Sequence, residues 1–115
     1  MTEHNYFGSH ETQCKCGCGM DIKPELRSQL NVLREAYGHP IVVYSGARCK
    51  DYNRRIGGAV HSAHTLGLAA DLGFPSSKKR RWKLIHECTR FFGNLGFYSG
   101  FIHVDLRDGH RYWTG

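Results

Sequence analysis

The sequence contains no apolar run that approaches the ~18 residues of a membrane-spanning helix, so no transmembrane segment is expected. It also has no linker rich in proline, glycine or serine, no low-complexity stretch and no internal repeat. These features predict a single domain over residues 1–115 with one hydrophobic core. The N-terminus has neither a basic start nor an apolar block, and it therefore predicts no secretory signal peptide.

The composition is that of an ordinary globular domain, with 40% hydrophobic and 23% charged residues, which rules out a disordered or collagen-like chain. Basic residues outnumber acidic ones by 16 to 10, and the net charge is +6. This excess predicts an anionic partner: nucleic acid, a membrane surface or an acidic cell-wall polymer. Plain solubility is the alternative. The densest basic run, residues 78–81 with Lys83, is interpreted as a solvated face or as a patch for anionic cell-envelope polymers.

Hydrophobic spacing and breaker residues predict a small α+β domain with helices packed on an antiparallel sheet. Residues 1–20 are expected to form an irregular, cysteine-rich arm. A first long helix is predicted over 24–37, and a second from 78 to 95 with Gly96 at its end. Between and after them, strands are expected at 41–44, 68–74, 97–98, 101–106 and 111–113, with a short helical turn at 50–56. In the second helix, the residues predicted to face the core are Trp82, Ile85, Cys88 (or Thr89), Phe92 and Leu95.

Two histidines and an aspartate are the strongest candidates for metal chemistry. His64 stands at a loop end, Asp71 lies in the following strand, and His103 lies far downstream. Residues two apart in a strand face the same side, so Asp105 is expected to point into the same site as His103. Two imidazoles and one carboxylate are a known catalytic zinc set that leaves the fourth position open for water. On chemistry alone the set is a weak indication, because the chain has 8 histidines.

Four separated motifs add a family resemblance. They are Ser-Gly-Ala-Arg-Cys at 45–49, Asn-Arg-Arg-Ile-Gly-Gly-Ala at 53–59, Ser-x-His-x-x-Gly-x-Ala-x-Asp at 62–71 and Phe-Ile-His-Val-Asp at 101–105. In this order they resemble the zinc D-Ala-D-Ala carboxypeptidase family of peptidoglycan peptidases, whose metal site is shared with hedgehog signalling domains. The Cys-Lys-Cys-Gly-Cys-Gly segment at 14–19 is similar to the compact subgroup found in phages and bacteria. The likeness covers residues 12–113.

The resemblance implies a role for each matching residue. His64, Asp71 and His103 correspond to the ligands of one zinc ion per chain. Arg48 corresponds to the residue that binds and polarises the substrate, because its planar fork suits a carbonyl or a carboxylate. Ser62 is expected either to hydrogen-bond near the metal or the substrate or to make only a local hydrogen bond within its own turn.

One position departs from the family pattern. Many members carry a general-base carboxylate three residues before the last zinc histidine, and Gly100 stands there in this chain. Asp105 is the nearest replacement, either as the base or as a carboxylate that orients His103. His61 is a further candidate.

The cysteines are unusual in number and spacing. Five is an odd count, so at least one must be free, metal-bound or paired with another chain. Cys14, Cys16 and Cys18 lie two apart and differ from the usual Cys-x-x-Cys of zinc ribbons. A contact between this arm and Cys49 would pin the arm to the active-site loop, as a disulfide, a second metal site or simple packing. Cys88 is expected to be a buried, inert thiol.

These observations together predict a monomeric zinc metallopeptidase that cuts the stem peptide of peptidoglycan, as an endopeptidase or a D-Ala-D-Ala carboxypeptidase. Small size, positive charge, the absent signal and the absence of a wall-binding module are typical of an endolysin from a phage of a Gram-negative host. Such a protein is made in the cytoplasm and reaches the wall after membrane breach. A bacterial enzyme of peptidoglycan remodelling is the alternative origin. The first alternative is a hedgehog-like zinc-binding module without hydrolysis, which Gly100 favours. The second is a basic nucleic-acid-binding domain, although no specific nucleic acid is expected because Trp82 is assigned to the core.

Overall fold

The computed structural model describes residues 4–115. Its helices are α1 (Ser9–Thr12), α2 (Pro24–Tyr37), α3 (Lys50–Arg55), the 3-10 helix η1 (Ala63–Leu66) and α4 (Lys78–Phe91). Its strands are β1 (Val43–Ser45), β2 (Ala69–Gly73), β3 (Asn94–Phe97), β4 (Phe101–Asp105) and β5 (Arg111–Thr114). Within residues 4–115 no helix combines the length and the apolarity that a membrane crossing requires.

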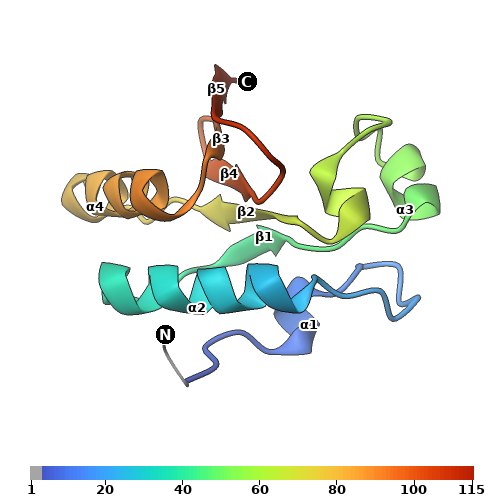
Figure 1. Ribbon diagram of the computed structural model, residues 1–115, viewed down its shortest axis with the longest axis horizontal. Helices are drawn as coiled ribbons and strands as arrows, with labels where there is room; N and C mark the ends of the chain where they lie inside the picture. The colour runs from blue at the N-terminus through green and yellow to red at the C-terminus, as the bar shows by residue number, and fades with distance from the viewer. Residues whose placement is uncertain (1–3) are drawn as a thin grey trace.

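The five strands form one sheet in the order β1-β2-β4-β3-β5. The β1–β2, β2–β4 and β3–β4 pairs are antiparallel, as predicted, and the α+β class is confirmed. The last pair differs, because β5 runs parallel to β3. In Figure 1, α2 lies along the lower side of the sheet, whereas α4 and α3 lie at opposite ends of the view.

The strand alternation separates a core face from a polar face. On β4, Ile102 and Val104 are completely buried in the hydrophobic core together with residues of α2 and α4. The residues between and beside them, His103 and Asp105, point to the other face because successive side chains in a strand alternate. The same alternation on β2 sends Leu72 to the core and Asp71 to the polar face. One face of the sheet therefore packs against the helices, and the other carries the histidine and aspartate side chains.

The first long helix follows its prediction, whereas the second does not. Pro24 opens α2, and Gly38 ends it by donating its N–H to the carbonyl of Arg34. Helix α4 ends at Phe91 rather than 95, because Phe92 already has extended backbone angles and β3 begins at Asn94. The assignment of residue 95 to the helix and of Gly96 to its end was therefore wrong.

The predicted buried face of α4 was wrong at Trp82, whose side chain is 67% exposed. The helix buries Cys88, as predicted, and Leu84, which was not predicted. At 3.6 residues per turn, Trp82 lies about 200° around the helix from Leu84, so both cannot face the core. Trp82 stands at the surface beside the basic run. The nucleic-acid interpretation was set aside because Trp82 was assigned to the core, and that reason does not hold. Cys88 is buried as predicted, and burial raises the pKa of its thiol.

The N-terminal arm is more ordered than the sequence suggested. It contains α1, and Phe7 joins the hydrophobic core with 1% exposure. The carbonyl of Thr12 accepts a hydrogen bond of 2.8 Å from the Ala47 N–H. The arm therefore packs against the loop that follows β1.

Candidate metal centre

Neighbouring strands and one short helix bring the three predicted ligands together. The β2–β4 register places Asp71 directly opposite His103. His64 lies in η1, whose start is capped by the Ser62 Oγ, which accepts the His64 N–H at 3.2 Å. His64 Nε2 lies 3.2 Å from Asp71 Oδ1, and His103 Nδ1 lies 2.9 Å from the same oxygen. One possible ligand atom of each residue thus lies within 4.8 Å of the others.

Each histidine ring is oriented by a partner on its far side. The Gly46 carbonyl lies 2.6 Å from His64 Nδ1, and because a carbonyl only accepts, Nδ1 carries the proton and Nε2 is left for a metal. On His103 the order is reversed. Asp105 Oδ2 lies 2.8 Å from Nε2, which leaves Nδ1 directed at Asp71. Such outer partners set the tautomer of a metal-binding histidine.

Asp71 divides its two oxygens between different partners. Oδ1 faces the two histidines, and Oδ2 accepts a 3.3 Å hydrogen bond from Arg48 Nη2. Burial alone raises the pKa of this carboxyl, but the hydrogen bonds with His103 and His64 outweigh burial and hold the pKa of Asp71 well below its usual range. Asp71 is therefore an anion held in a fixed orientation.

Asp105 is completely buried beneath this group. Besides His103, it is bound by Arg107, whose Nη2 donates to Oδ2 at 2.9 Å and whose backbone N–H donates to Oδ1 at 3.1 Å. Burial raises the pKa of Asp105, but the hydrogen bonds from His103 and Arg107 prevail and lower it to about 2. His103 lies between two carboxylates. Burial lowers its pKa, and the hydrogen bonds with Asp105 and Asp71 more than reverse that effect.

The donor set fits a zinc ion. Ligand atoms held ~2.0–2.2 Å from one tetrahedral ion lie roughly 3.3 Å apart, close to the 2.9 and 3.2 Å separations that Asp71 Oδ1 makes with the two rings. Two imidazole nitrogens and one carboxylate are donors that zinc accepts.

A cavity of about 320 Å³ opens over the three residues. His61 and Ser62 line it on one side, and Arg48 and Arg107 supply two cationic groups. Tyr98, Phe101 and Trp113 form an aromatic wall, in which Tyr98 stacks on Phe101 with centroids 4.5 Å apart and the Trp113 Nε1–H donates to the Tyr98 hydroxyl at 3.1 Å. The space above the candidate ligands therefore offers positive charge and flat apolar surface.

A sequence profile of the family described as Peptidase M15 matches residues 5–105 of the chain. The chain belongs to the peptidase M15 family. A search among curated proteins gives no match. The family match confirms the resemblance to zinc D-Ala-D-Ala carboxypeptidase-type peptidases, and the five-stranded sheet with its helices fits the hedgehog-like fold.

M15 peptidases in general depend on zinc, and this member has a matching His64, Asp71 and His103 group. Sequence reasoning did not find several residues that shape the site. The role of the Gly46 carbonyl could not be predicted, because every residue has a backbone carbonyl and the residue type does not show which one contacts His64. Tyr98, Arg107 and Trp113 were visible only as residues near predicted strands, and nothing in their spacing showed that β4 and β5 bring them to one cavity.

Arg48 is built into this M15 site by its own hydrogen bonds. Its Nε donates to Ser45 Oγ at 3.1 Å and its Nη1 donates to Asn53 Oδ1 at 3.2 Å, in addition to the bond with Asp71. Asn53 is itself held by a 2.8 Å bond to the Ala59 carbonyl. The guanidinium thus lines the cavity while three of its nitrogens are already positioned.

Replacing Arg48 with lysine is expected to reduce turnover by at least about 10-fold, a loss of ~1.4 kcal/mol of transition-state stabilisation. A single ammonium group cannot reproduce three donors in a planar fork. Steady-state kinetics of peptide hydrolysis with Arg48→Lys measures the effect. Arg54→Lys, at an exposed position of α3, is the matched control, and equal rates in the two variants would contradict the prediction.

Gly46 leaves no space for a side chain, because a Cβ there would lie 2.3 Å from the Thr12 carbonyl oxygen. Both groups are backbone, so Gly46→Ala must push the arm away from the loop that orients His64. We expect a loss of about 1–3 kcal/mol in the free energy of unfolding, which lowers Tm by several degrees. Thermal melting measures the loss. Gly100→Ala is the control, since a Cβ there meets nothing within 4 Å, and a Gly46→Ala variant that melts with it would contradict the steric argument.

Proposed function

We propose that residues 1–115 form one zinc peptidase domain that hydrolyses peptide bonds in the stem peptide of peptidoglycan. The observation that carries the proposal is the convergence of His64 Nε2, Asp71 Oδ1 and His103 Nδ1 at the base of an open cavity. We propose these three residues as the zinc ligands. A zinc ion held there supplies Lewis-acid chemistry toward a water molecule and a peptide carbonyl.

The side chains around the ligands support distinct roles. Arg48 projects its guanidinium into the cavity beside Asp71 and is proposed to bind the substrate carbonyl or terminal carboxylate, and Ser62 is proposed as a further hydrogen-bonding group at the rim. The aromatic wall offers surface for the apolar parts of a stem peptide. The net charge of +6 suits a polymer that carries carboxylates.

Two residues are candidates for handling the proton. Asp105 has both oxygens engaged by His103 and Arg107 and is completely buried, which supports a positioning role in which it orients His103. His61 lines the cavity and is exposed to solvent, so it is placed to exchange a proton with water. We propose that Asp105 positions His103 and that His61 carries the proton. The alternative is that Asp105 itself is the general base.

A phage endolysin is the biological setting that we propose, because a small basic peptidase suits release onto the wall after membrane breach. The specific alternative is a zinc-binding module that has lost hydrolysis. It is favoured by Gly100, which places no side chain where many relatives carry the general base.

Lysis of purified Gram-negative sacculi tests the proposal. Turbidity should fall with wild-type protein, new amino groups should appear, and a chelator should stop both. Zinc binding without release of amino groups would support the inactive module. Absence of both zinc binding and amino-group release, with salt-dependent binding to DNA, would support a nucleic-acid-binding domain. This outcome is included because Trp82 is exposed beside the basic run.

A further inference from the structure

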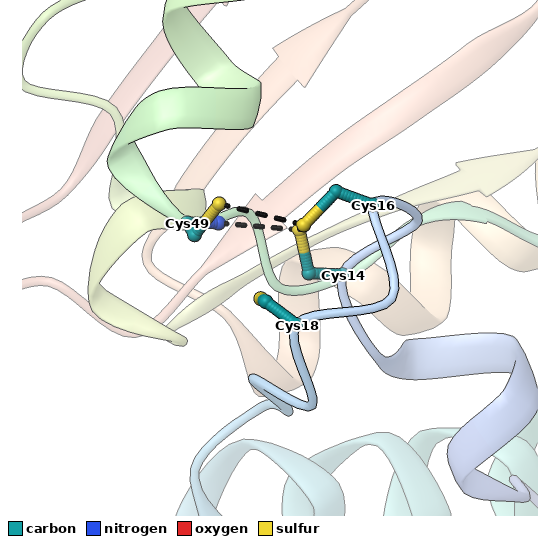
Figure 2. A group of neighbouring side chains, drawn as sticks. All are labelled: Cys14, Cys16, Cys18 and Cys49. Atoms are coloured by element: carbon teal, nitrogen blue, oxygen red, sulfur yellow. Dashed lines mark hydrogen bonds between the residues drawn. The ribbon is translucent and has the colours of Figure 1, made fainter.

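A second group of metal-type side chains lies away from the hydrolytic site. Cys14, Cys16 and Cys18 come from the N-terminal arm, and Cys49 comes from the residue just before α3. Their four sulfur atoms lie within 4.8 Å of one another. Figure 2 shows the four side chains facing a common space between the arm and the start of α3. Two segments 31 or more residues apart in sequence thus contribute to one sulfur cluster.

The backbone of the arm is folded so that alternate residues converge. Gly17 and Gly19 have φ values of +84° and +91°, in the left-handed region that glycine tolerates best. The Gly17 N–H donates to the Cys14 carbonyl at 3.2 Å, and the Cys14 N–H donates to the Met20 carbonyl at 2.7 Å. An extended Cys-x-Cys-x-Cys strand would send all three side chains to one side in a row, whereas this closed loop gathers them around a point.

Packing does not explain the cluster. Cys14 is buried, but Cys16 and Cys18 are exposed and gain no transfer free energy by meeting there. Disulfide bonding does not explain it either. The Cys14–Cys16 and Cys16–Cys49 sulfur separations are 3.4 and 3.6 Å, far from the ~2.05 Å of an S–S bond, and one bond would leave two thiols gathered without a reason.

The separations agree with a shared metal ion. Four thiolates held ~2.3 Å from a tetrahedral zinc ion lie roughly 3.8 Å apart. Two backbone amides already donate to the sulfurs: the Cys49 N–H to Cys14 Sγ at 3.4 Å and the Tyr52 N–H to Cys49 Sγ at 3.3 Å. Donors of this kind stabilise thiolate charge.

We infer that Cys14, Cys16, Cys18 and Cys49 bind one zinc ion in a closed tetrahedral site, distinct from the His64–Asp71–His103 group. Four protein ligands leave no open position, so the site is structural. Binding replaces the thiol protons, which pass to solvent, and no oxidation is involved.

The site would act on the hydrolytic centre through the short loop at 46–49. Cys49 directly follows Arg48, whose N–H donates to the His64 carbonyl at 3.0 Å. Gly46 orients the His64 ring, and the Ala47 N–H binds the arm at Thr12. A metal that joins Cys49 to the arm therefore restrains this loop. Its loss should loosen the position of His64 without removing a ligand of the hydrolytic site.

Metal analysis of protein purified with zinc under reducing conditions tests the inference. We expect about two zinc ions per chain in the wild type and about one in Cys18→Ser, a substitution at an exposed position. Cys88→Ala, which changes the buried thiol of α4, is the matched control and should keep both ions. His103→Ala should lose the other ion and keep the cysteine-bound one. If the hydrolytic assignment fails, the zinc content of both proteins falls by about one ion, and the difference of about one ion between the wild type and Cys18→Ser remains. The two failures are therefore distinguishable.

Cobalt substitution gives a second reading that does not depend on a variant being stable. The wild type and His103→Ala should show the charge-transfer absorption of thiolate bound to cobalt, and Cys18→Ser should lose most of it while circular dichroism stays unchanged. Absence of this absorption from folded wild-type protein would overturn the inference. A disulfide among the four residues, detected by mass and by thiol titration without reductant, would overturn it as well, and so would stoichiometric iron in place of zinc.

Discussion

His103→Ala is expected to remove hydrolysis almost completely, by about 10³-fold or more, and to release the zinc ion of the hydrolytic site. A Lewis acid contributes several kcal/mol to the stabilisation of developing charge, and each 1.36 kcal/mol corresponds to a tenfold rate. His103 is central to the group because its ring bridges Asp71 and Asp105. Alanine would remove a candidate ligand and leave two buried carboxylates without their shared partner. Amino-group release from sacculi, measured with the zinc content of the same sample, checks both effects.

His86→Ala is the matched control for this experiment, because His86 is an exposed histidine on α4. It should keep wild-type activity and zinc content. If His103→Ala retained its full zinc content and its rate, the ligand set proposed here would be incorrect.

Asp105→Asn is expected to weaken zinc affinity at the hydrolytic site by about 10–100-fold, with activity restored by excess zinc. The reason is that Asp105 accepts from His103 Nε2 and so presents the opposite ring nitrogen to Asp71. A neutral amide is a weaker acceptor, and it turns a second donor toward Arg107. Zinc titration of the activity measures the change. Asp108→Asn, at an exposed turn, is the control and should titrate like the wild type.

The same variant separates the two roles considered for this carboxylate. A base at Asp105 predicts unchanged zinc affinity and a loss of ~10² or more in turnover that zinc does not restore. Unchanged affinity together with unchanged turnover would remove Asp105 from both roles, and His61→Ala would then be the next variant to measure.

The sequence predicted the parts of the fold that depend on local chemistry. Pro24 and Gly38 bracket α2 as expected, because a proline at the first turn and a glycine past the last act within a few residues. The end of α4 was harder to predict from the sequence, because Leu95 fits a helical repeat as well as a strand. Its pairing with Val104 decides for the strand. Trp82 was misplaced for a similar reason: its spacing matches an apolar stripe, and only the position of the sheet decides that Leu84, together with the predicted Cys88, faces the core.

The candidate site divides along the same line. His64, Asp71, His103 and Asp105 are side chains with strong chemical preferences, and a motif places them in order. The Gly46 carbonyl, the Arg48–Asn53 bond and the aromatic wall depend on how distant segments meet, which local spacing does not encode. The sequence suggested a contact between the arm and Cys49, and the structure contains one. The convergence of all four sulfur atoms could be seen only in the folded loop.

The pairing of Asp71 with His103 across β2 and β4 links the chemistry of the protein to the way its sheet assembles. A slip of one residue would place Ile102 or Val104 opposite Asp71 and turn His103 to the other face. An ion that binds all three ligands is bound only by the native pairing, so by mass action its binding free energy stabilises that pairing and none of its competitors. Metal binding would then favour the native strand register over its neighbours. Without the metal, only the alternation of apolar and polar residues would distinguish these registers.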